Sequence, residues 1–189
     1  MLPRHLITAV AFASLAISAQ AQMSAWDLFD RMDAVLKGKW LLSTPDRQTG
    51  TDSYKHPALL PLIGTDRTGT AYKLIGGDVT IMEDLLPDTT KQMVTMYHCR
   101  DIACTTLKAT HYCSKQNQPE FISDLNASTP ERFVFNCDMD TELCRSDEDH
   151  VHTIILELSE EDKHLKASYL SWKEGKPLEH SSIYHFDRP

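Results

Sequence analysis

The sequence lacks several patterns that identify common classes of protein. It has no lysine and arginine cluster, no glycine-rich phosphate loop, no Gly-x-Ser-x-Gly nucleophile motif and no carboxylate pair spaced for glycoside hydrolysis. It also has no internal repeat. These absences remove the strongest sequence signals for nucleotide binding and for the common hydrolases.

Positive charge is scarce. The 189 residues include 19 Lys and Arg against 27 Asp and Glu, a formal net charge of −8. A chain with this charge repels phosphate backbones and anionic lipid surfaces. We therefore expect no nucleic-acid partner.

Long hydrophobic runs are missing except near the start. Arg4 precedes an apolar run over residues 6–17, and the small residues of 19–21 fit a cleavage point. This pattern predicts a secretory signal peptide over residues 1–21 and a mature chain that begins near Gln22. The run of about a dozen residues is shorter than the roughly 20 that a membrane-spanning helix needs. We expect cleavage rather than an uncleaved anchor, no stable membrane anchor afterwards, and a periplasmic or secreted location.

Cysteine is also sparse, and all five cysteines lie in the predicted mature part. Cys99 and Cys104 flank four residues, and Cys137 and Cys144 flank six. In an oxidising compartment each pair would close a hairpin loop as a disulfide, which leaves Cys113 unpaired. Metal ligation by these cysteines stays open as the alternative, although no Cys-x-x-Cys spacing occurs.

The remaining patterns predict one helix followed by short strands. Ser24 is a plausible N-cap, apolar residues then recur at helical spacing, and Gly38 supplies a stop, so the helix should cover about residues 24–37. Residues 44–70 read as a long loop over one end. The predicted strands are 39–43, 71–75, 78–85, 92–99, 105–113, 132–136, 150–158, 164–173 and 181–186.

The order of these elements predicts a mainly β fold. Strands at regular spacing joined by short turns point to an antiparallel meander, either closed into a barrel or folded as a sandwich. We favour the barrel because closure removes exposed strand edges. Residues 22–189 are enough for one domain with a single core.

Alternation within two strands indicates which polar side chains face inward. The apolar face of one strand carries His111 and Cys113, and that of another carries His150 and His152. We therefore predict that the four side chains point into the interior near the barrel mouth and contact a ligand. Imidazole and thiolate bind zinc or copper, and neutral histidine also binds haem iron or acts as a general base. His111, His150 and His152 are the candidate metal ligands, and ordinary structural packing is the alternative.

Three further residues read as structural. Trp40 follows the helix and Arg188 follows the last strand, so the indole and the guanidinium could stack at the closed end of a barrel. Trp172 lies next to a predicted turn. We expect it to pack in the core rather than to line a cofactor.

Several motifs resemble a known family. Residues 92–98, the Thr-His-Tyr-Cys motif at 110–113 and the Asn-Gln-Pro motif at 117–119 are similar to the signature of an uncharacterised bacterial family of exported lipocalin-like β-barrel proteins. The resemblance covers residues 38–188. It implies a lipocalin-like barrel and no particular activity, because that family has none assigned.

The same resemblance bears on the ligand and the cysteines. The Gly-x-Trp start at residues 38–40 is similar to lipocalin and nitrobindin-like barrels, which bind small apolar molecules or haem. The two cysteine-flanked loops depart from the family pattern, so their disulfides look like local additions. Cys113 belongs to the shared motif, which supports leaving it unpaired.

Together these features predict an exported barrel that binds a small apolar or amphipathic molecule of unknown identity, with or without a histidine-lined metal or haem site. No catalytic residue and no cofactor is assigned. One alternative is a hydrolase- or isomerase-like enzyme that uses His111 or His152 near Cys113. The other is a structural envelope protein with a filled barrel, which should have no internal cavity above about 300 Å³, the low end for ligand pockets.

Overall fold

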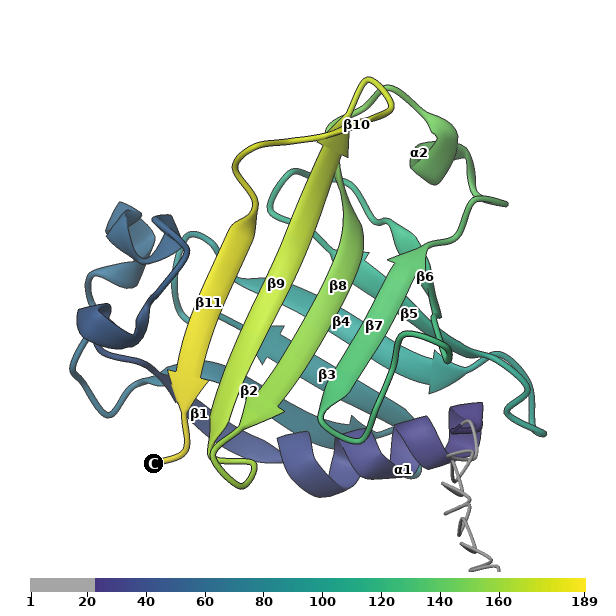
Figure 1. The fold of residues 1–189 in the computed structure, drawn as a ribbon, viewed down its shortest axis with the longest axis horizontal. Coiled ribbons are helices and arrows are strands. Elements are labelled where there is room, and N and C mark those ends of the chain that lie inside the picture. The colour runs from purple at the N-terminus through teal and green to yellow at the C-terminus, as the bar shows by residue number, and fades with distance from the viewer. Residues whose placement is uncertain (1–22) are drawn as a thin grey trace, which may run out of the picture.

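The computed structural model describes residues 23–189, so the predicted signal peptide lies outside the described residues. The described chain is mainly β, with two α-helices and a closed antiparallel barrel of ten strands (Figure 1). The helices and strands are α1 Ala25–Leu36, β1 Gly38–Leu42, β2 Thr68–Ile75, β3 Thr80–Leu85, β4 Met93–Cys99, β5 Leu107–Tyr112, β6 Glu120–Ser123, β7 Arg132–Cys137, α2 Glu142–Arg145, β8 His150–Ser159, β9 His164–Lys173, β10 Lys176–Pro177 and β11 Ser182–Asp187.

The sheet order follows the chain. Strands β1 to β8 pair in sequence, β8 pairs with β9, and β11 lies between β9 and β1, which closes the barrel. The predicted barrel and the helix before it are confirmed, and the sandwich alternative is wrong. Strand β6 was not predicted, because its four residues lie directly after Pro119 and are too few for a clear alternation.

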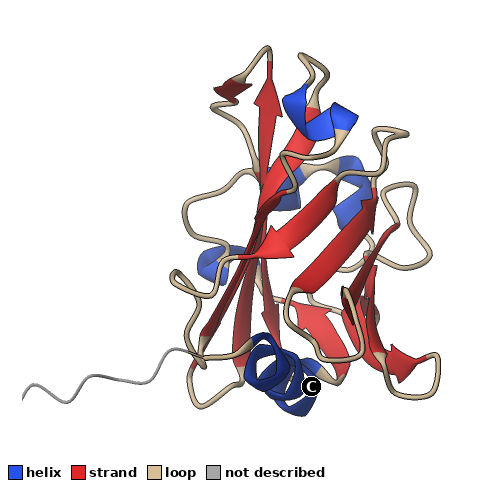
Figure 2. Ribbon diagram, turned by 90° about the vertical axis from the view of Figure 1, so that its right-hand side faces the viewer, coloured by secondary structure: helices blue, strands red, loops and turns tan. Residues whose placement is uncertain are grey.

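Helix α1 begins at a capping box and closes one end of the barrel. The Ser24 hydroxyl accepts a hydrogen bond from the Asp27 amide at 3.1 Å, and the Asp27 carboxylate accepts one from the Ser24 amide at 3.0 Å. The buried face of α1 contacts β2, β4 and β5. Figure 2 shows α1 at one end and α2 at the other.

The expected contact between Trp40 and Arg188 is present beside α1. The guanidinium carbon of Arg188 lies 3.8 Å from the centroid of the Trp40 ring, and the same group donates hydrogen bonds to the carbonyls of Val35 and Lys37. The indole Nε1 donates to the carbonyl of Leu36 at 2.8 Å. These bonds satisfy carbonyls that the last turn of a helix leaves free.

The long segment before β2 lies along β11 rather than across an end (Figure 1), and it contains three short 3-10 helices. Strand β11 pairs with β1 through only two residue pairs, which leaves backbone groups of its first half without a strand partner. Gln48 accepts from the His185 amide and donates to the His185 carbonyl, and Ser53 accepts from the Ile183 amide. The side chains of Gln48 and Ser53 therefore take the place of a partner strand along this edge of β11, because buried backbone groups require hydrogen-bond partners. This contact between the loop and β11 is called the seam.

Replacing Gln48 with alanine should lower the free energy of unfolding by about 2 kcal/mol, because Gln48 is 4% exposed and its loss leaves the buried amide of His185 without an acceptor. Urea unfolding measures the change. Gln48→Glu is the matched control: it retains an acceptor but turns a second oxygen toward the carbonyls of Ser43 and His185, so it should not restore stability. Full stability in Gln48→Ala would mean that this seam contributes little.

Both predicted disulfides are formed. Cys99 and Cys104 join the ends of the turn between β4 and β5, and Cys137 and Cys144 join the end of β7 to α2. Cys113 is free and half-buried.

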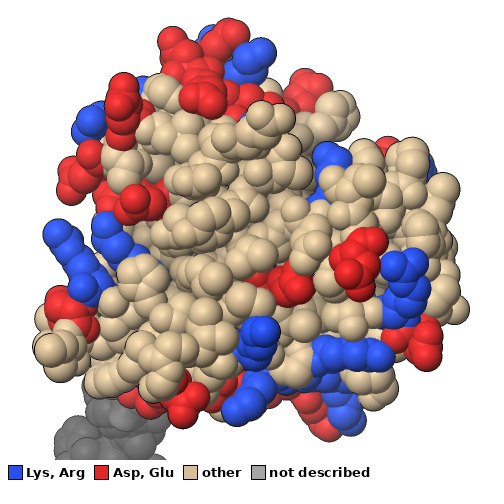
Figure 3. Space-filling model, turned by 180° about the vertical axis from the view of Figure 1, so that it is seen from behind, with Lys and Arg blue, Asp and Glu red and all other residues tan. Residues whose placement is uncertain are grey.

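Among the described residues, no helix has the length and apolar character needed to cross a membrane. Acidic side chains gather at the end of the barrel that carries β10 and α2 (Figure 3).

Candidate functional site

A buried carboxylate occupies the barrel interior. Glu83 on β3 is fully buried and accepts hydrogen bonds from three tyrosine hydroxyls. Tyr72 and Tyr169 donate to Oε1 at 2.7 and 2.5 Å, and Tyr97 donates to Oε2 at 2.9 Å. These residues come from β2, β3, β4 and β9, so a single side chain links four strands across the interior.

The charges of this cluster are set by burial. Burial raises the pKa of the Glu83 carboxyl, and the hydroxyl donors around it act in the opposite direction. Burial and then the nearby carboxylate raise the pKa of Tyr72, Tyr97 and Tyr169 well above the ordinary range, so the phenols remain protonated donors. No lysine or arginine of the described residues forms an ion pair with Glu83.

Thr95 joins His111 on β5 to this cluster. The Nδ1 atom of His111 lies 2.9 Å from the hydroxyl oxygen of Thr95, and Thr95 stands opposite Glu83 in the register of β3 and β4. With its proton on Nδ1, the neutral ring presents a lone pair at Nε2. Burial lowers the pKa of His111 to about 4, which keeps the ring neutral at neutral pH.

A small pocket of about 50 Å³ opens at the end of the barrel opposite α1. His111 lines it, and the Nε2 atom of His111 is buried with no hydrogen-bond partner among the described residues. Lys115 at the rim pairs with Asp149 and donates to the Ser171 hydroxyl at 3.0 Å. The pocket is lined by Lys91, Met93, His111, Cys113, Ser114, Lys115, Val151, Tyr169, Ser171, Ser182 and Tyr184.

Two of the four predicted site residues, His111 and Cys113, lie at this pocket, whereas His150 and His152 do not line it. The four residues are therefore divided between this pocket and a second place in the fold. The reason is a β-bulge: Val151 pairs with Ser171 and Thr153 pairs with Leu170, so His152 is an extra residue that shifts the register. Val151 consequently lines the pocket in place of the histidines.

His150 and His152 form a separate pair beside the second disulfide. His150 Nε2 lies 3.1 Å from His152 Nδ1, and His150 Nδ1 lies 2.7 Å from the Glu148 carbonyl oxygen. The His152 ring stacks on Trp172 with centroids 4.0 Å apart. Trp172 is half-buried and lies outside the main core, so the prediction that it packs in the core was wrong.

The pocket at the mouth does not fit a haem. Its volume of about 50 Å³ is far below the roughly 300 Å³ at which ordinary ligand pockets begin. Aromatic side chains fill the barrel below it, including Phe121, Phe133 and Phe135, each 0% exposed. A larger groove of about 960 Å³ lies outside the barrel, between residues 50–56 and residues 178–183, and contains none of the predicted site residues.

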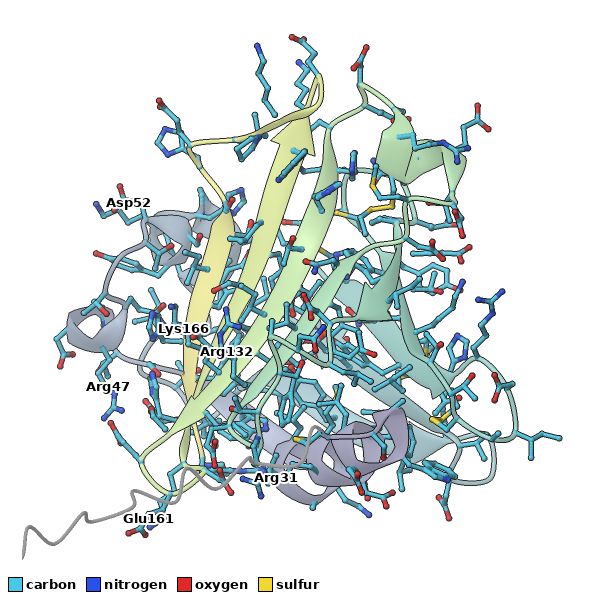
Figure 4. All side chains as sticks on the ribbon, turned by 45° about the vertical axis from the view of Figure 1, so that its right-hand side comes forward. Arg31, Arg47, Asp52, Arg132, Glu161 and Lys166 are labelled. Atoms are coloured by element: carbon cyan, nitrogen blue, oxygen red, sulfur yellow. A yellow bond between two sulfur atoms is a disulfide. The ribbon has the colours of Figure 1, made fainter. Side chains whose placement is uncertain are left out.

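Two other polar clusters lie on the outer wall. In Figure 4, Arg132 on β7 and Lys166 on β9 lie close together, and both pair with Glu157 on the strand between them. At the α1 end, His164 contacts Asp187 at 2.8 Å and His185 at 3.0 Å. These residues join neighbouring strands.

Glu83, the residue at the centre of the interior, was not among the predicted site residues. A signal was present: Ile81, Glu83 and Leu85 alternate within one predicted strand, so the apolar residues on either side place Glu83 on the inward face. Tyr72 and Tyr97 occupy equivalent positions in their strands.

No protein-family model matches the chain, and no curated protein matches it. The similarity to exported lipocalin-like barrels inferred from the motifs therefore stays a prediction.

Proposed function

We propose that this protein is an exported β-barrel that binds a compact polar molecule at its open end, with His111 and Cys113 as contact residues. The observation that supports binding is the Nε2 atom of His111, which is buried at a pocket without a hydrogen-bond partner. Buried polar atoms are rarely left in this state. Export rests on the pattern of residues 1–21, and the two disulfides are consistent with it.

The pocket restricts the chemistry of the ligand. A volume of about 50 Å³ holds one or two water-sized groups, since a water occupies about 30 Å³. The neutral His111 ring offers a lone pair, so the inserted group should carry a hydrogen-bond donor. Lys91 at the rim favours a negative charge on the part that stays outside, whereas Lys115 is already paired with Asp149. A small hydroxy acid meets both requirements.

A catalytic role fits the geometry less well. His152 does not share a pocket with Cys113, and His111 with a pKa of about 4 is a weak base at neutral pH. The filled barrel is the second candidate, because the cluster around Glu83 and the aromatic core occupy the interior. In a filled structural barrel the Nε2 atom of His111 would bind no ligand.

NMR of the protein labelled with ¹⁵N-histidine tests the proposal with three probes: glycolate, acetate and ethanol. Glycolate carries both a hydroxyl donor and a carboxylate, so it should shift the Nε2 resonance of His111 more strongly than either of the others. Signals are assigned by their loss in His111→Gln. His56, which is exposed, serves as the internal control and should not move.

Lys91→Gln should weaken the response to glycolate and leave that to ethanol unchanged. If none of the three probes shifts His111 at millimolar concentration, the proposed binding site is wrong and the filled structural barrel is the better description.

A further inference from the structure

The Cys137–Cys144 disulfide and the two histidines beside it lie apart from the pocket at the mouth. We propose that Cys137, Cys144, His150 and His152 form a four-coordinate site for a thiophilic metal ion, Zn(II) or Cu(I), once the Cys137–Cys144 disulfide is reduced. In the oxidised protein the two sulfurs are bonded to each other and do not bind a metal, and reduction makes them available as ligands.

The geometry already suits a metal. One ligand atom from each of Cys137, His150 and His152 lies within 4.8 Å of the others, and the two imidazole nitrogens are 3.1 Å apart. Two ligands of a tetrahedral zinc at 2.0–2.1 Å are separated by about 3.3 Å, so the histidines need little movement. The disulfide bond places the Cys144 sulfur next to that of Cys137. Two sulfurs and two nitrogens are a donor set typical of zinc or copper(I).

Hydrogen bonding prepares His150 as a ligand. The Nδ1–H of His150 donates to the Glu148 carbonyl, which leaves the Nε2 lone pair free. In the structure His152 Nδ1–H donates to this lone pair. A metal would replace that proton, which moves to Nε2 of His152, while stacking on Trp172 holds the ring in place.

The surroundings favour a cation. The connection from β7 to β8 carries six acidic residues and a single basic one, Arg145. His150, Cys137 and Cys144 are buried, whereas His152 is partly exposed and offers a path of entry. Two thiolates balance the charge of one Zn(II), so the filled site would be neutral, as a buried site requires.

The chemical step balances with a dithiol as the reductant. The disulfide accepts two electrons and two protons from the dithiol, which itself becomes a disulfide, and Cys137 and Cys144 become thiols. Zn(II) then binds both sulfurs as thiolates and releases the two protons. While the disulfide is intact the sulfurs are not thiolates, and only the two histidines can act as ligands.

A second histidine pair in the same barrel provides a contrast. His164 and His185 also have ring nitrogens 3.0 Å apart, and the other ring nitrogen of His185 contacts the Thr49 carbonyl, as that of His150 contacts the Glu148 carbonyl. Arg47 places its guanidinium 3.0 Å from His164 Nδ1, where it would repel a metal ion (Figure 4 labels Arg47). No cysteine joins this pair, so it serves as the matched control.

The test uses Co(II) as a spectroscopic probe and Zn(II) in competition with a chromophoric chelator. Protein treated with dithiothreitol and desalted without oxygen should bind one Co(II) with a thiolate charge-transfer band and the visible bands of a tetrahedral ion. Untreated protein should lack the charge-transfer band. Loss of a partner of a metal ligand alone costs about 10- to 100-fold in affinity, so His150→Ala with His152→Ala should weaken Zn(II) binding by about tenfold or more.

Three double variants separate this site from the other cysteines and from the other histidine pair. Cys137→Ser with Cys144→Ser should abolish the charge-transfer band, whereas Cys99→Ser with Cys104→Ser should retain it, as should His164→Ala with His185→Ala. The proposal is overturned if reduced protein gives no such band, or if the band and the affinity survive loss of both His150 and His152. It is also overturned if the reduced chain loses its near-UV circular dichroism and Zn(II) does not restore it.

Discussion

Replacing Glu83 with alanine should lower the free energy of unfolding by about 4 kcal/mol. The change leaves the hydroxyls of Tyr72, Tyr97 and Tyr169 without their acceptor inside the barrel. A buried donor without a partner costs about 1–3 kcal/mol, and removal of the buried charge offsets part of the total. Domains are stable by only about 5–15 kcal/mol. The midpoint temperature of thermal unfolding should therefore fall by roughly 10 °C, and urea unfolding measures the change in free energy directly.

Glu83→Gln is the control for this prediction. Glutamine keeps the length of the side chain and one acceptor oxygen, and it replaces the charge and the second oxygen by an NH2 group that can donate to the Tyr97 hydroxyl, so its effect should be smaller, within about 2 kcal/mol. A loss below about 1 kcal/mol in Glu83→Ala would contradict the central role of this carboxylate and indicate that the phenols readily find other partners.

The second large effect concerns pH. In the folded chain, burial lowers the pKa of His111 from 6.5 to about 4. Between these values the unfolded chain binds a proton that the folded ring does not, so acidification favours unfolding. The contribution of His111 is complete above pH 6.5 and is lost as the pH falls toward 4. At about 1.4 kcal/mol per pKa unit, the loss is about 3 kcal/mol.

His111→Gln should flatten this dependence, because glutamine does not titrate. The measurement is the free energy of unfolding from urea curves at several pH values between 7 and 4, compared as a difference between the two proteins. Groups such as His152 and His185, whose pKa burial also lowers, contribute equally to both proteins and cancel. Parallel curves for wild type and variant would show that His111 is not held neutral.

The barrel could be predicted because its strands obey a period of two over most of their length. In β5 the alternation correctly placed Leu107, Ala109 and His111 inside, and the helix before β1 followed from its cap and its apolar spacing. The disulfides followed from two short cysteine spacings. Each of these features depends on neighbours in the sequence.

The candidate site could be predicted only in part, because it depends on contacts between distant strands. The alternation in β8 holds from Ile154 onward but is shifted before it by the bulge at His152, and no residue there marks a bulge as a glycine would. The burial of Glu83 could be predicted from its own strand. Its partnership with Tyr169, 86 positions away, could not, since it requires the closed barrel.

The side chains of Gln48 and Ser53 that complete the edge of β11 have a consequence for motion. A ladder between two strands opens by breaking several backbone hydrogen bonds together, whereas this seam is held by individual rotamers of a loop. The first half of β11, which also borders the pocket at Ser182 and Tyr184, can therefore separate from the loop while its pairing with β9 stays intact. The wall of the barrel beside this pocket is thus held on one side by a strand ladder and on the other by side chains alone.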